Sequence, residues 1–368
     1  MKADEAEFVA RRHPEAASDY GQAPVVVFWE ITKACALACR HCRAQAQPQR
    51  HPQELTTEEG RHLVDELAQF NPKPILVISG GDPLMRRDLF EIAGYAISQG
   101  LRTSLSPSVT ALVTPANLSS ACLAGVRHIS FSLDGATAKS HDGFRGVQGS
   151  FERTLQSVAM ASEVGLSVQV NTTVSHWNLE ELDSIAAVVA GSGAMLWDLF
   201  FLVPTGRAKA AEMLSAEEHE VVFNWLYELS AKASFRTKTT LGQHYRRVAL
   251  QRGGTSAAAV HTASTNDGKG ICFISHTGQI FPSGFLPIDC GSVRTSSVRQ
   301  VYSSHPVFKQ LRDPSRLKGK CGVCPFNQIC GGCRARAYAC TGDYLEAEPA
   351  CKYDARAEAL SAGIAQSS

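Results

Sequence analysis

"CALACRHC" occupies residues 35–42 and contains three cysteines, Cys35, Cys39 and Cys42, with gaps of three and two residues. Four thiolates around one ion form the closed structural site typical of zinc proteins. Three thiolates in one short loop can instead hold three irons of a 4Fe–4S cube, and the fourth iron can then bind a substrate or cofactor. From these cysteines alone, a zinc site or a chance cluster stays open as the alternative.

Charge and composition exclude several classes of partner. The chain of 368 residues has 36 basic and 35 acidic side chains, a balance that creates no overall field for nucleic acid or an anionic membrane. No stretch approaches the roughly 18 apolar residues of a membrane span, and the polar N-terminus lacks a signal-peptide core. Twelve cysteines without a secretory signal indicate a reducing compartment. We therefore expect a cytoplasmic protein whose clustered thiols bind metal.

Short apolar runs alternate with helical patterns over the first two hundred residues. The runs that predict strands are 25–32, 74–81, 101–106, 128–135, 166–174 and 195–203. The intervening segments have helical patterns, and the first of these, 55–70, opens with a capping box of Thr56 and Glu59. Strands separated by helices predict an α/β fold with a parallel sheet, whose chemistry gathers at the C-terminal strand ends.

Distinctive motifs fall at these strand ends. The cysteine loop follows the first strand, "GGDP" (80–83) the second and "SPS" (106–108) the third, while "SLDG" (132–135) and "HDGFRG" (141–146) lie at and after the fourth. Taken singly, "GGDP" suits an ordinary turn and Arg145 a surface ion pair. Together and in this order the motifs resemble those of the radical S-adenosylmethionine (SAM) superfamily. The resemblance implies a partial (β/α)6 barrel of the TIM type.

It also implies a chemistry and its residues. Cys35, Cys39 and Cys42 would hold a 4Fe–4S cluster whose open iron is chelated by SAM, and reductive cleavage would give a 5′-deoxyadenosyl radical that abstracts a substrate hydrogen. The SAM-binding positions implied are Gly80, Gly81, Asp82, Pro83, Ser106, Ser132, Asp134 and Arg145. Two positions depart from the usual pattern. His41 stands where an aromatic residue usually precedes the third cysteine, and Asp82 stands where Glu is usual.

A second group of cysteines lies near the C-terminus, in "CGVCPFNQICGGC" (321–333) and beyond. Paired Cys-x2-Cys units also suit a zinc knuckle. Behind a radical SAM core, the pattern resembles the SPASM/twitch extension, which carries auxiliary 4Fe–4S clusters. The resemblance implies one auxiliary cluster, held by Cys321, Cys324, Cys330 and Cys351. A second, inner ligand set looks incomplete, because Ser283 occupies one expected cysteine position, and the roles of Cys272, Cys290, Cys333 and Cys340 stay open.

The same resemblance suggests how the chain is divided. We expect an N-terminal tail (1–24), a radical SAM core (25–235), a bridging segment (236–270), a SPASM/twitch domain (271–354) and a C-terminal tail (355–368). The bridging segment includes a stretch rich in Gly, Ser, Thr and Ala at 251–270, which favours a loop or domain boundary.

Three longer motifs narrow the resemblance to the haem-biosynthesis branch of SPASM enzymes, which includes the Fe-coproporphyrin decarboxylase. They are "FFLVPTGRA" (200–208), "LKGKCGVC" (317–324) and "CGGCRARAYACTGDYLEAEPAC" (330–351). The departures noted above suggest a sister group within that branch. The implied reaction is oxidative decarboxylation or another modification of a tetrapyrrole propionate, with an electron donor such as ferredoxin or flavodoxin.

The basic residues of 309–320, with Arg334 and Arg336, would suit such an anionic substrate, and a solvated face beside a cluster stays open as the alternative. Two other functions stay open. One is a peptide (RiPP) maturase that modifies a short precursor peptide, although residues 1–24 are too few for the recognition domain that such enzymes usually carry. The other is a non-catalytic zinc or iron–sulfur protein.

Overall fold

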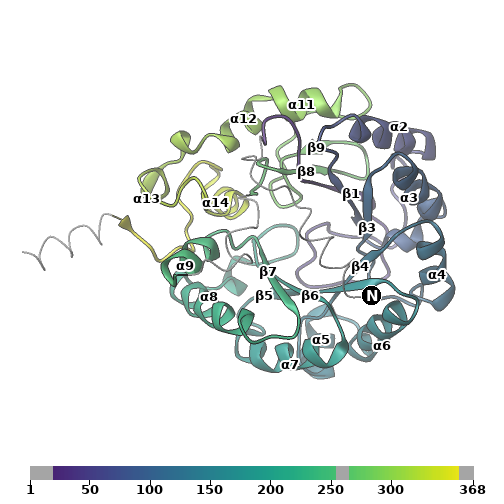
Figure 1. Cartoon of the computed structure of the whole chain (residues 1–368), viewed down its shortest axis with the longest axis horizontal. Coiled ribbons are helices and arrows are strands. Elements are labelled where there is room, and N and C mark those ends of the chain that lie inside the picture. Colours follow the sequence, from purple (N-terminus) through teal and green to yellow (C-terminus); the bar gives the residue numbers. More distant parts are fainter. Residues whose placement is uncertain (1–19, 254–264, 356–368) are drawn as a thin grey trace, which may run out of the picture.

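The computed structural model describes residues 20–253 and 265–355, so parts of the expected tails and of the bridging segment lie outside the described residues. A single curved sheet forms its centre, with strand order β7-β6-β5-β4-β3-β2-β1-β8-β9 (Figure 1). Every neighbouring pair is parallel except β8 and β9. The strands are β1 (Val26–Thr32), β2 (Ile75–Gly80), β3 (Arg102–Leu105), β4 (His128–Ser132), β5 (Ser167–Val174), β6 (Leu196–Phe201), β7 (Arg236–Thr240), β8 (Ile271–Ile274) and β9 (Ile280–Phe281).

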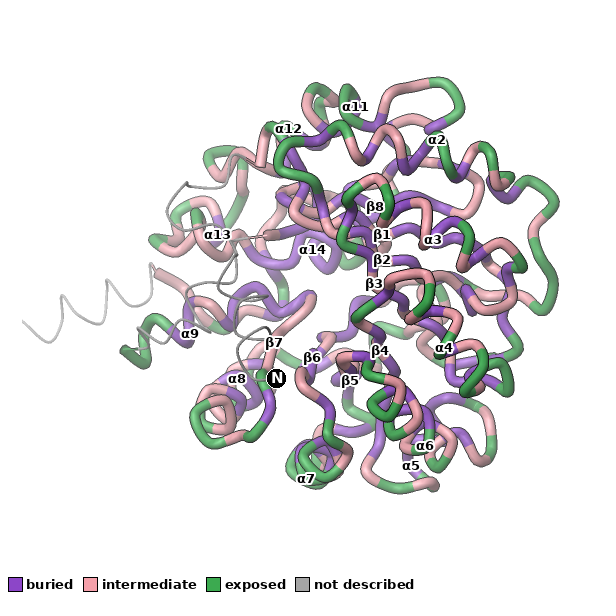
Figure 2. The backbone as a smooth tube through the Cα atoms, turned by 45° about the vertical axis from the view of Figure 1, so that its right-hand side comes forward, coloured by how far each residue is buried: buried purple, intermediate pink, exposed green. Residues whose placement is uncertain are grey.

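Helices surround the convex side of the sheet (Figure 1). They are α2 (Thr57–Ala68), α3 (Leu89–Ser98), α4 (Pro115–Leu123), α5 (Ala138–Arg145), α6 (Ser150–Glu163), α7 (Leu182–Ser192), α8 (Ala216–Ser230), α9 (Tyr245–Gln251), α11 (Val298–Ser304), α12 (Pro306–Arg312), α13 (Gly319–Gly322) and α14 (Arg334–Thr341). Alternate strand residues such as Trp29, Phe131 and Trp197 are fully buried between sheet and helices. Figure 2 shows this as buried strands inside half-exposed helices.

The sequence predicted this architecture well. Each of the six expected strands is present as β1 to β6, and the capping box of Thr56 and Glu59 is confirmed at the start of α2. The parallel sheet confirms the predicted fold class. Strands β7 and β8 were not predicted, because "RTKTT" is polar and "ICFI" is only four residues long. They extend the sheet beyond β6 and beyond β1, respectively, while the proposed domain boundaries stay predictions.

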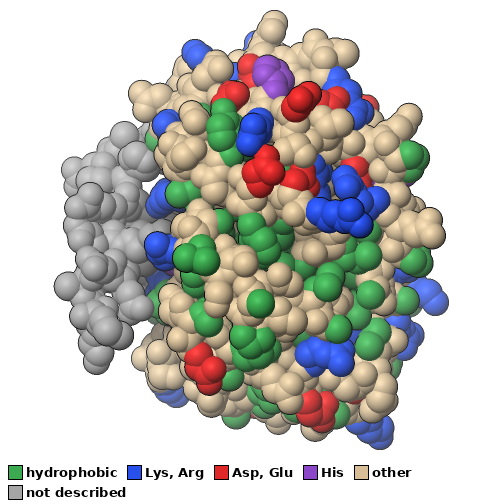
Figure 3. Space-filling model, turned by 90° about the vertical axis from the view of Figure 1, so that its right-hand side faces the viewer, with side chains coloured by type: hydrophobic (Ala, Val, Ile, Leu, Met, Phe, Trp, Pro, Cys, Tyr) green, Lys and Arg blue, Asp and Glu red, His purple; other side chains and the backbone are tan. Residues whose placement is uncertain are grey.

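The face of the molecule beside α3 and α4 carries both signs of charge, as the near-neutral composition suggests (Figure 3). On the face beside α3 and α4, Lys, Arg, Asp and Glu side chains are interspersed with small hydrophobic patches (Figure 3). No helix among the described residues is both long and apolar enough to cross a membrane.

Helix α14 lies at the open side of the sheet, between β7 and β8 (Figures 1 and 2). From this helix Arg336, which is fully buried, donates to the carbonyl oxygens of Phe201 at 3.2 Å and Leu241 at 2.8 Å, which end β6 and follow β7. Its Nη1 lies 3.1 Å from the carboxylate of the equally buried Glu348. One guanidinium therefore joins the C-terminal region to the sheet.

Arg334 is also buried, and it donates to the carbonyl oxygens of Tyr344 and Glu346. The prediction that Arg334 and Arg336 face substrate carboxylates is therefore wrong, because both guanidiniums are bonded inside the fold. Several neighbours are similarly engaged. Arg312 donates to three backbone carbonyls and Lys318 pairs with Asp343.

Arg336→Met should lower the free energy of unfolding by about 3–5 kcal/mol, because it leaves the buried Glu348 carboxylate without its counter-charge. The exposed Arg316 pairs with Asp313 across 3.5 Å, so Arg316→Met should cost less than about 1 kcal/mol. Urea unfolding of anaerobically prepared protein, followed by tryptophan fluorescence, measures both. Equal midpoints for the two variants would contradict the structural role of Arg336.

Candidate active site

The cysteine loop follows β1 directly. Cys35 and Cys39 are buried and Cys42 is half-buried. The backbone N–H of Leu37 donates to Cys35 Sγ at 3.3 Å, and that of Ala46 donates to Cys42 Sγ at 3.5 Å. Burial raises the pKa of the Cys35 and Cys39 thiols. Bound iron would supply the positive charge that favours the thiolates, so the donor set fits a metal cluster.

The glycines of "GGDP" bring β2 against this loop. Gly81 N–H donates to Thr32 O at 2.8 Å, and Asp82 N–H donates to Ala34 O at 2.7 Å. A Cβ at Gly81 would lie 2.3 Å from Ala34 O, which no side chain tolerates. Ser108, after β3, donates to Gly81 O at 2.6 Å and lies 3.4 Å from Cys35 Sγ. The motifs after β1, β2 and β3 therefore meet at one place.

Asp82 stabilises this turn with its own side chain. It is fully buried, and its carboxylate accepts from Leu84 N–H at 3.1 Å and from Thr110 Oγ1 at 2.8 Å. Burial raises the pKa of the Asp82 carboxyl to about 6. Its neighbour Pro83 begins a short 3-10 helix, Pro83–Met85. Both carboxylate oxygens have partners within the fold, so the turn offers its backbone to a ligand.

His41 fills the place of the expected aromatic residue by stacking. Its ring lies 4.3 Å from that of Phe144, with 14° between the planes. Arg145, the last residue of α5, approaches His41 Nε2 at 3.4 Å and Asp134 Oδ2 at 3.2 Å. Burial, followed by the charges of Arg145 and Arg207, lowers the pKa of His41 well below its usual range. A neutral imidazole can therefore accept from Arg145 beside the cluster loop.

The other predicted SAM-binding residues lie along the same strand ends. Asp134 is fully buried and accepts from Thr173 N–H at 2.7 Å, which fixes the carboxylate that holds Arg145. Ser106 accepts from Ser130 Oγ at 2.9 Å, and Ser132 ends β4. The structure thus places these residues at or just beyond the C-terminal ends of β3 and β4, and their individual roles toward SAM stay predictions.

Sequence reasoning missed a polar cluster on the concave face of the sheet. Asp198 in β6 is fully buried, and one carboxylate oxygen accepts from Lys238 Nζ and Thr240 Oγ1, both at 2.9 Å. Its other oxygen has no hydrogen-bond partner among the described residues. The preceding Trp197 packs on Trp225 of α8, so Asp198 faces the opposite, concave side. The sequence signal for this cluster was an acidic residue, Asp198, inside the otherwise apolar stretch "LWDLFF".

The motif "PTGRA" also acquires a structural role. Arg207 Nε donates to Cys39 O at 2.9 Å, and Arg207 N–H donates to Cys42 O at 3.1 Å. Gly206, with φ +69°, lies so close that a Cβ would be 2.5 Å from Cys42 O. The loop after β6 therefore clamps the cysteine loop through its carbonyl groups.

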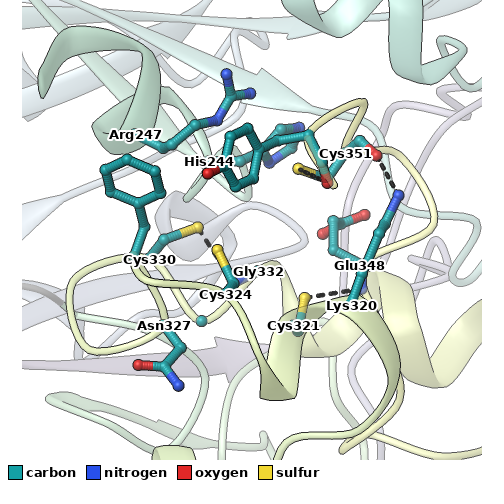
Figure 4. Close-up of a pocket in the computed structure, with 13 residues that line it drawn as sticks. His244, Arg247, Lys320, Cys321, Cys324, Asn327, Cys330, Gly332, Glu348 and Cys351 are labelled. Atoms are coloured by element: carbon teal, nitrogen blue, oxygen red, sulfur yellow. Dashed lines mark hydrogen bonds between the residues drawn. The ribbon is translucent and has the colours of Figure 1, made fainter. Parts of the chain in front are cut away.

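The C-terminal cysteines form a separate site. A cavity of about 380 Å³, counted with its open mouth, is lined by all four predicted ligands (Figure 4): Cys321, Cys324, Cys330 and Cys351. Burial raises the pKa of the Cys330 thiol to about 12. The cysteines of open role, Cys272, Cys290, Cys333 and Cys340, do not line this cavity. Among the residues that the structure describes, no three His, Cys, Asp or Glu side chains converge on a single metal ion.

Comparison with known proteins identifies the family. The model of the radical SAM superfamily matches residues 29–189. An AdoMet-dependent heme synthase of Methanosarcina barkeri is 42% identical over 340 residues, which cover 90% of this chain and 97% of that protein. This chain belongs to the radical SAM superfamily. It is accordingly a radical SAM enzyme, of a superfamily that uses a 4Fe–4S cluster and SAM, as the strand-end motifs predicted.

Two further comparisons give this radical SAM enzyme its context. An AdoMet-dependent heme synthase of Nitratidesulfovibrio vulgaris is 40% identical, over 90% of this chain and 93% of that protein. The crystal structure of Streptococcus suis SuiB bound to precursor peptide SuiA has a TM-score of 0.68 at 14% identity, covering 90% of this chain and 76% of that one. At this identity the likeness shows the fold alone. Placement in a sister group stays a prediction.

Gly81→Ala should displace the cysteine loop, because its Cβ would overlap Ala34 O next to Cys35. We expect loss of the SAM-dependent change in the electron paramagnetic resonance (EPR) signal of the reduced cluster, while the fold is retained by circular dichroism. Gly191→Ala in α7 is the matched control, because a Cβ there meets nothing within 4 Å. A Gly81→Ala protein with the normal SAM response would contradict the close approach as a requirement.

Proposed function

We propose that this radical SAM enzyme modifies a propionate side chain of a haem-precursor tetrapyrrole, by oxidative decarboxylation. One observation carries the proposal: the 42% identity to an AdoMet-dependent heme synthase extends over 97% of that protein. The resemblance of the C-terminal motifs to the haem branch agrees with that alignment. A peptide maturase remains the second candidate, because a structure of the same fold holds a precursor peptide.

The chain's own residues would divide the work as follows. Cys35, Cys39 and Cys42 would hold three irons of the cluster, and the "GGDP" backbone would contact the amino group of SAM. Arg145 has five N–H donors, of which Asp134 and His41 engage one nitrogen, so its guanidinium can also bind the SAM carboxylate. Ser132 would assist there, and Ser106 would contact the ribose. The bound cofactors supply a radical that abstracts a propionate β-hydrogen.

After hydrogen abstraction, release of CO2 leaves a vinyl group and one electron to be removed. We propose that an auxiliary 4Fe–4S cluster, held by Cys321, Cys324, Cys330 and Cys351, takes part in removing it. The four thiols line one cavity, which supports a common group between them. The reductant for SAM cleavage would be a ferredoxin or flavodoxin, and thiol-held clusters of this kind favour a cytoplasmic location.

Fe-coproporphyrin III with β-deuterated propionates should bind anaerobically, shift its Soret band and transfer deuterium to 5′-deoxyadenosine. The physical reason is that hydrogen abstraction is the first step of the proposed reaction. Mass spectrometry of 5′-deoxyadenosine measures the transfer. Cys39→Ala is the control and should give no 5′-deoxyadenosine, because one iron loses its ligand. Deuterium transfer from a peptide, without a response to any porphyrin, would favour the maturase instead.

Anaerobically reconstituted protein should hold two clusters, or about eight irons per chain. Cys330→Ala should remove about four of these irons, whereas Cys340→Ala, at the exposed end of α14, should retain all of them. Iron and zinc analysis of the purified proteins decides this. A content near about twelve irons would contradict the single auxiliary cluster, and tightly bound zinc with about four irons would indicate the knuckle.

A further inference from the structure

Two side chains from the start of α9 line the cavity of the C-terminal cysteines, and each has a buried nitrogen without a hydrogen-bond partner among the described residues. His244 precedes α9 and Arg247 lies three residues later, so the two side chains share a face of the helix. Both line the cavity with the four thiols, and Figure 4 shows them on the α9 side, across from Cys321 and Cys324. Neither residue belongs to a cysteine motif, and neither is used by the function proposed above.

The imidazole of His244 has no hydrogen-bond partner among the described residues. Its residue is 1% exposed, and neither Nδ1 nor Nε2 meets a donor or acceptor among the described residues. The Phe223 ring lies 4.6 Å away at 81° and the His219 ring 5.2 Å away. The charged side chains of Glu348, Arg336 and Arg247 also lie nearby. An imidazole carries at least one N–H in either protonation state. A buried donor without an acceptor is costly, so its partner should be sought in the cavity.

The hydrogen bonds of Arg247 leave one buried nitrogen without a partner among the described residues. Its Nη1 donates to Glu220 at 2.7 Å and to Gln251 at 2.8 Å, and Nη2 also bonds to Glu220. These bonds anchor the outer end of the guanidinium against α8. Its Nε is buried and has no partner among the residues described. The Arg247 charge also opposes the effect of burial on the pKa of Cys351.

The group that fits this cavity must therefore accept hydrogen bonds and carry negative charge. A 4Fe–4S cube with four thiolates has both properties, and its reduction potential depends on hydrogen bonds to its sulfurs. We propose that His244, with Arg247 Nε, donates N–H hydrogen bonds to sulfur atoms of the auxiliary cluster and thereby raises its reduction potential. The inference rests on the proposed auxiliary cluster. It assigns to the two side chains a positioning and tuning role in which neither is an iron ligand.

The functional consequence follows from charge. Reduction adds one electron to an already anionic cluster, and N–H donors stabilise that additional charge. Removing a donor should therefore make the potential more negative. In the proposed reaction, a more negative potential would make the auxiliary cluster a poorer acceptor of the electron left after CO2 release. SAM binding at the cysteine loop of residues 35–42 would not be affected.

An EPR-monitored redox titration of the full, reconstituted chain tests the proposal. The auxiliary signal is recognised because SAM does not change it. His244→Phe should make its potential more negative, by about a tenfold change in the reduced-to-oxidised ratio at fixed solution potential, which is about 59 mV for one electron. His244→Gln, which restores an N–H donor, should recover part of the shift. An unchanged potential in an iron-replete His244→Phe protein would overturn the proposal.

His219→Phe is the matched control. His219 is equally buried beside His244, and its Nε2 also has no partner in the described part of the chain, but it does not line the cavity. Its loss should leave the auxiliary potential unchanged. A shift as large as that of His244→Phe would mean that general loosening of α8 and α9, rather than a lost donor, sets the potential, and would overturn the assignment.

A second measurement on the unmodified protein does not depend on variants that assemble their clusters. With 15N-labelled histidine, pulsed EPR of the reduced auxiliary cluster should show a weak nitrogen coupling, and an exchangeable proton coupling should disappear in D2O. Absence of both couplings overturns the role of His244 while leaving the auxiliary cluster in place. A chain that holds only the first cluster overturns the auxiliary site itself and this inference with it.

Discussion

The close contact between Ala34 and Gly81 is the constraint on which the site depends. Two hydrogen bonds continue the β1–β2 pairing past the strand ends, and the glycine leaves no room for a Cβ between the two loops. This approach fixes the backbone immediately before Cys35. Ser108 then connects the loop after β3 to the loops after β1 and β2, through Cys35 Sγ and Gly81 O. Three consecutive strand ends of a parallel sheet thus form one surface, which we propose binds the iron cluster and SAM.

Arginine side chains donate hydrogen bonds to backbone carbonyl oxygens that the strands and loops leave without partners. Carbonyl oxygens in loops need donors when they are buried, and a guanidinium offers five in a fixed plane. Arg207 serves the carbonyls of the cysteine loop, Arg336 those beyond β6 and β7, and Arg334 those near Glu346. The same residue type therefore links the catalytic loop to the sheet and the C-terminal region to the barrel opening. The carboxylates of the proposed tetrapyrrole substrate must therefore pair with other cationic side chains.

The sequence predicted what depends on local pattern. Apolar runs predicted β1 to β6, and the spacing of the cysteines predicted the two groups of thiols. Both signals are local, because the period of a strand and the distance between metal ligands are set within a few residues. The polar strand β7 has no such pattern, since pairing with β6 rather than its own composition makes it a strand. Arg336 was misinterpreted because its charge is visible in the sequence and its burial is not. The role proposed for His244 could not be predicted, because its lack of a hydrogen-bond partner among the described residues arises only when α9 packs beside the cysteine cavity.

We propose that the three thiols near β1 leave one iron of their cluster without a protein ligand, whereas the four thiols near α13 and α14 leave none. Mössbauer spectroscopy of protein enriched in 57Fe, with and without SAM, tests it most directly. With two cubes present, SAM should change the spectrum of one iron in about eight and leave the other irons unchanged. No change at any iron, or a change at one iron of each cluster, would contradict it.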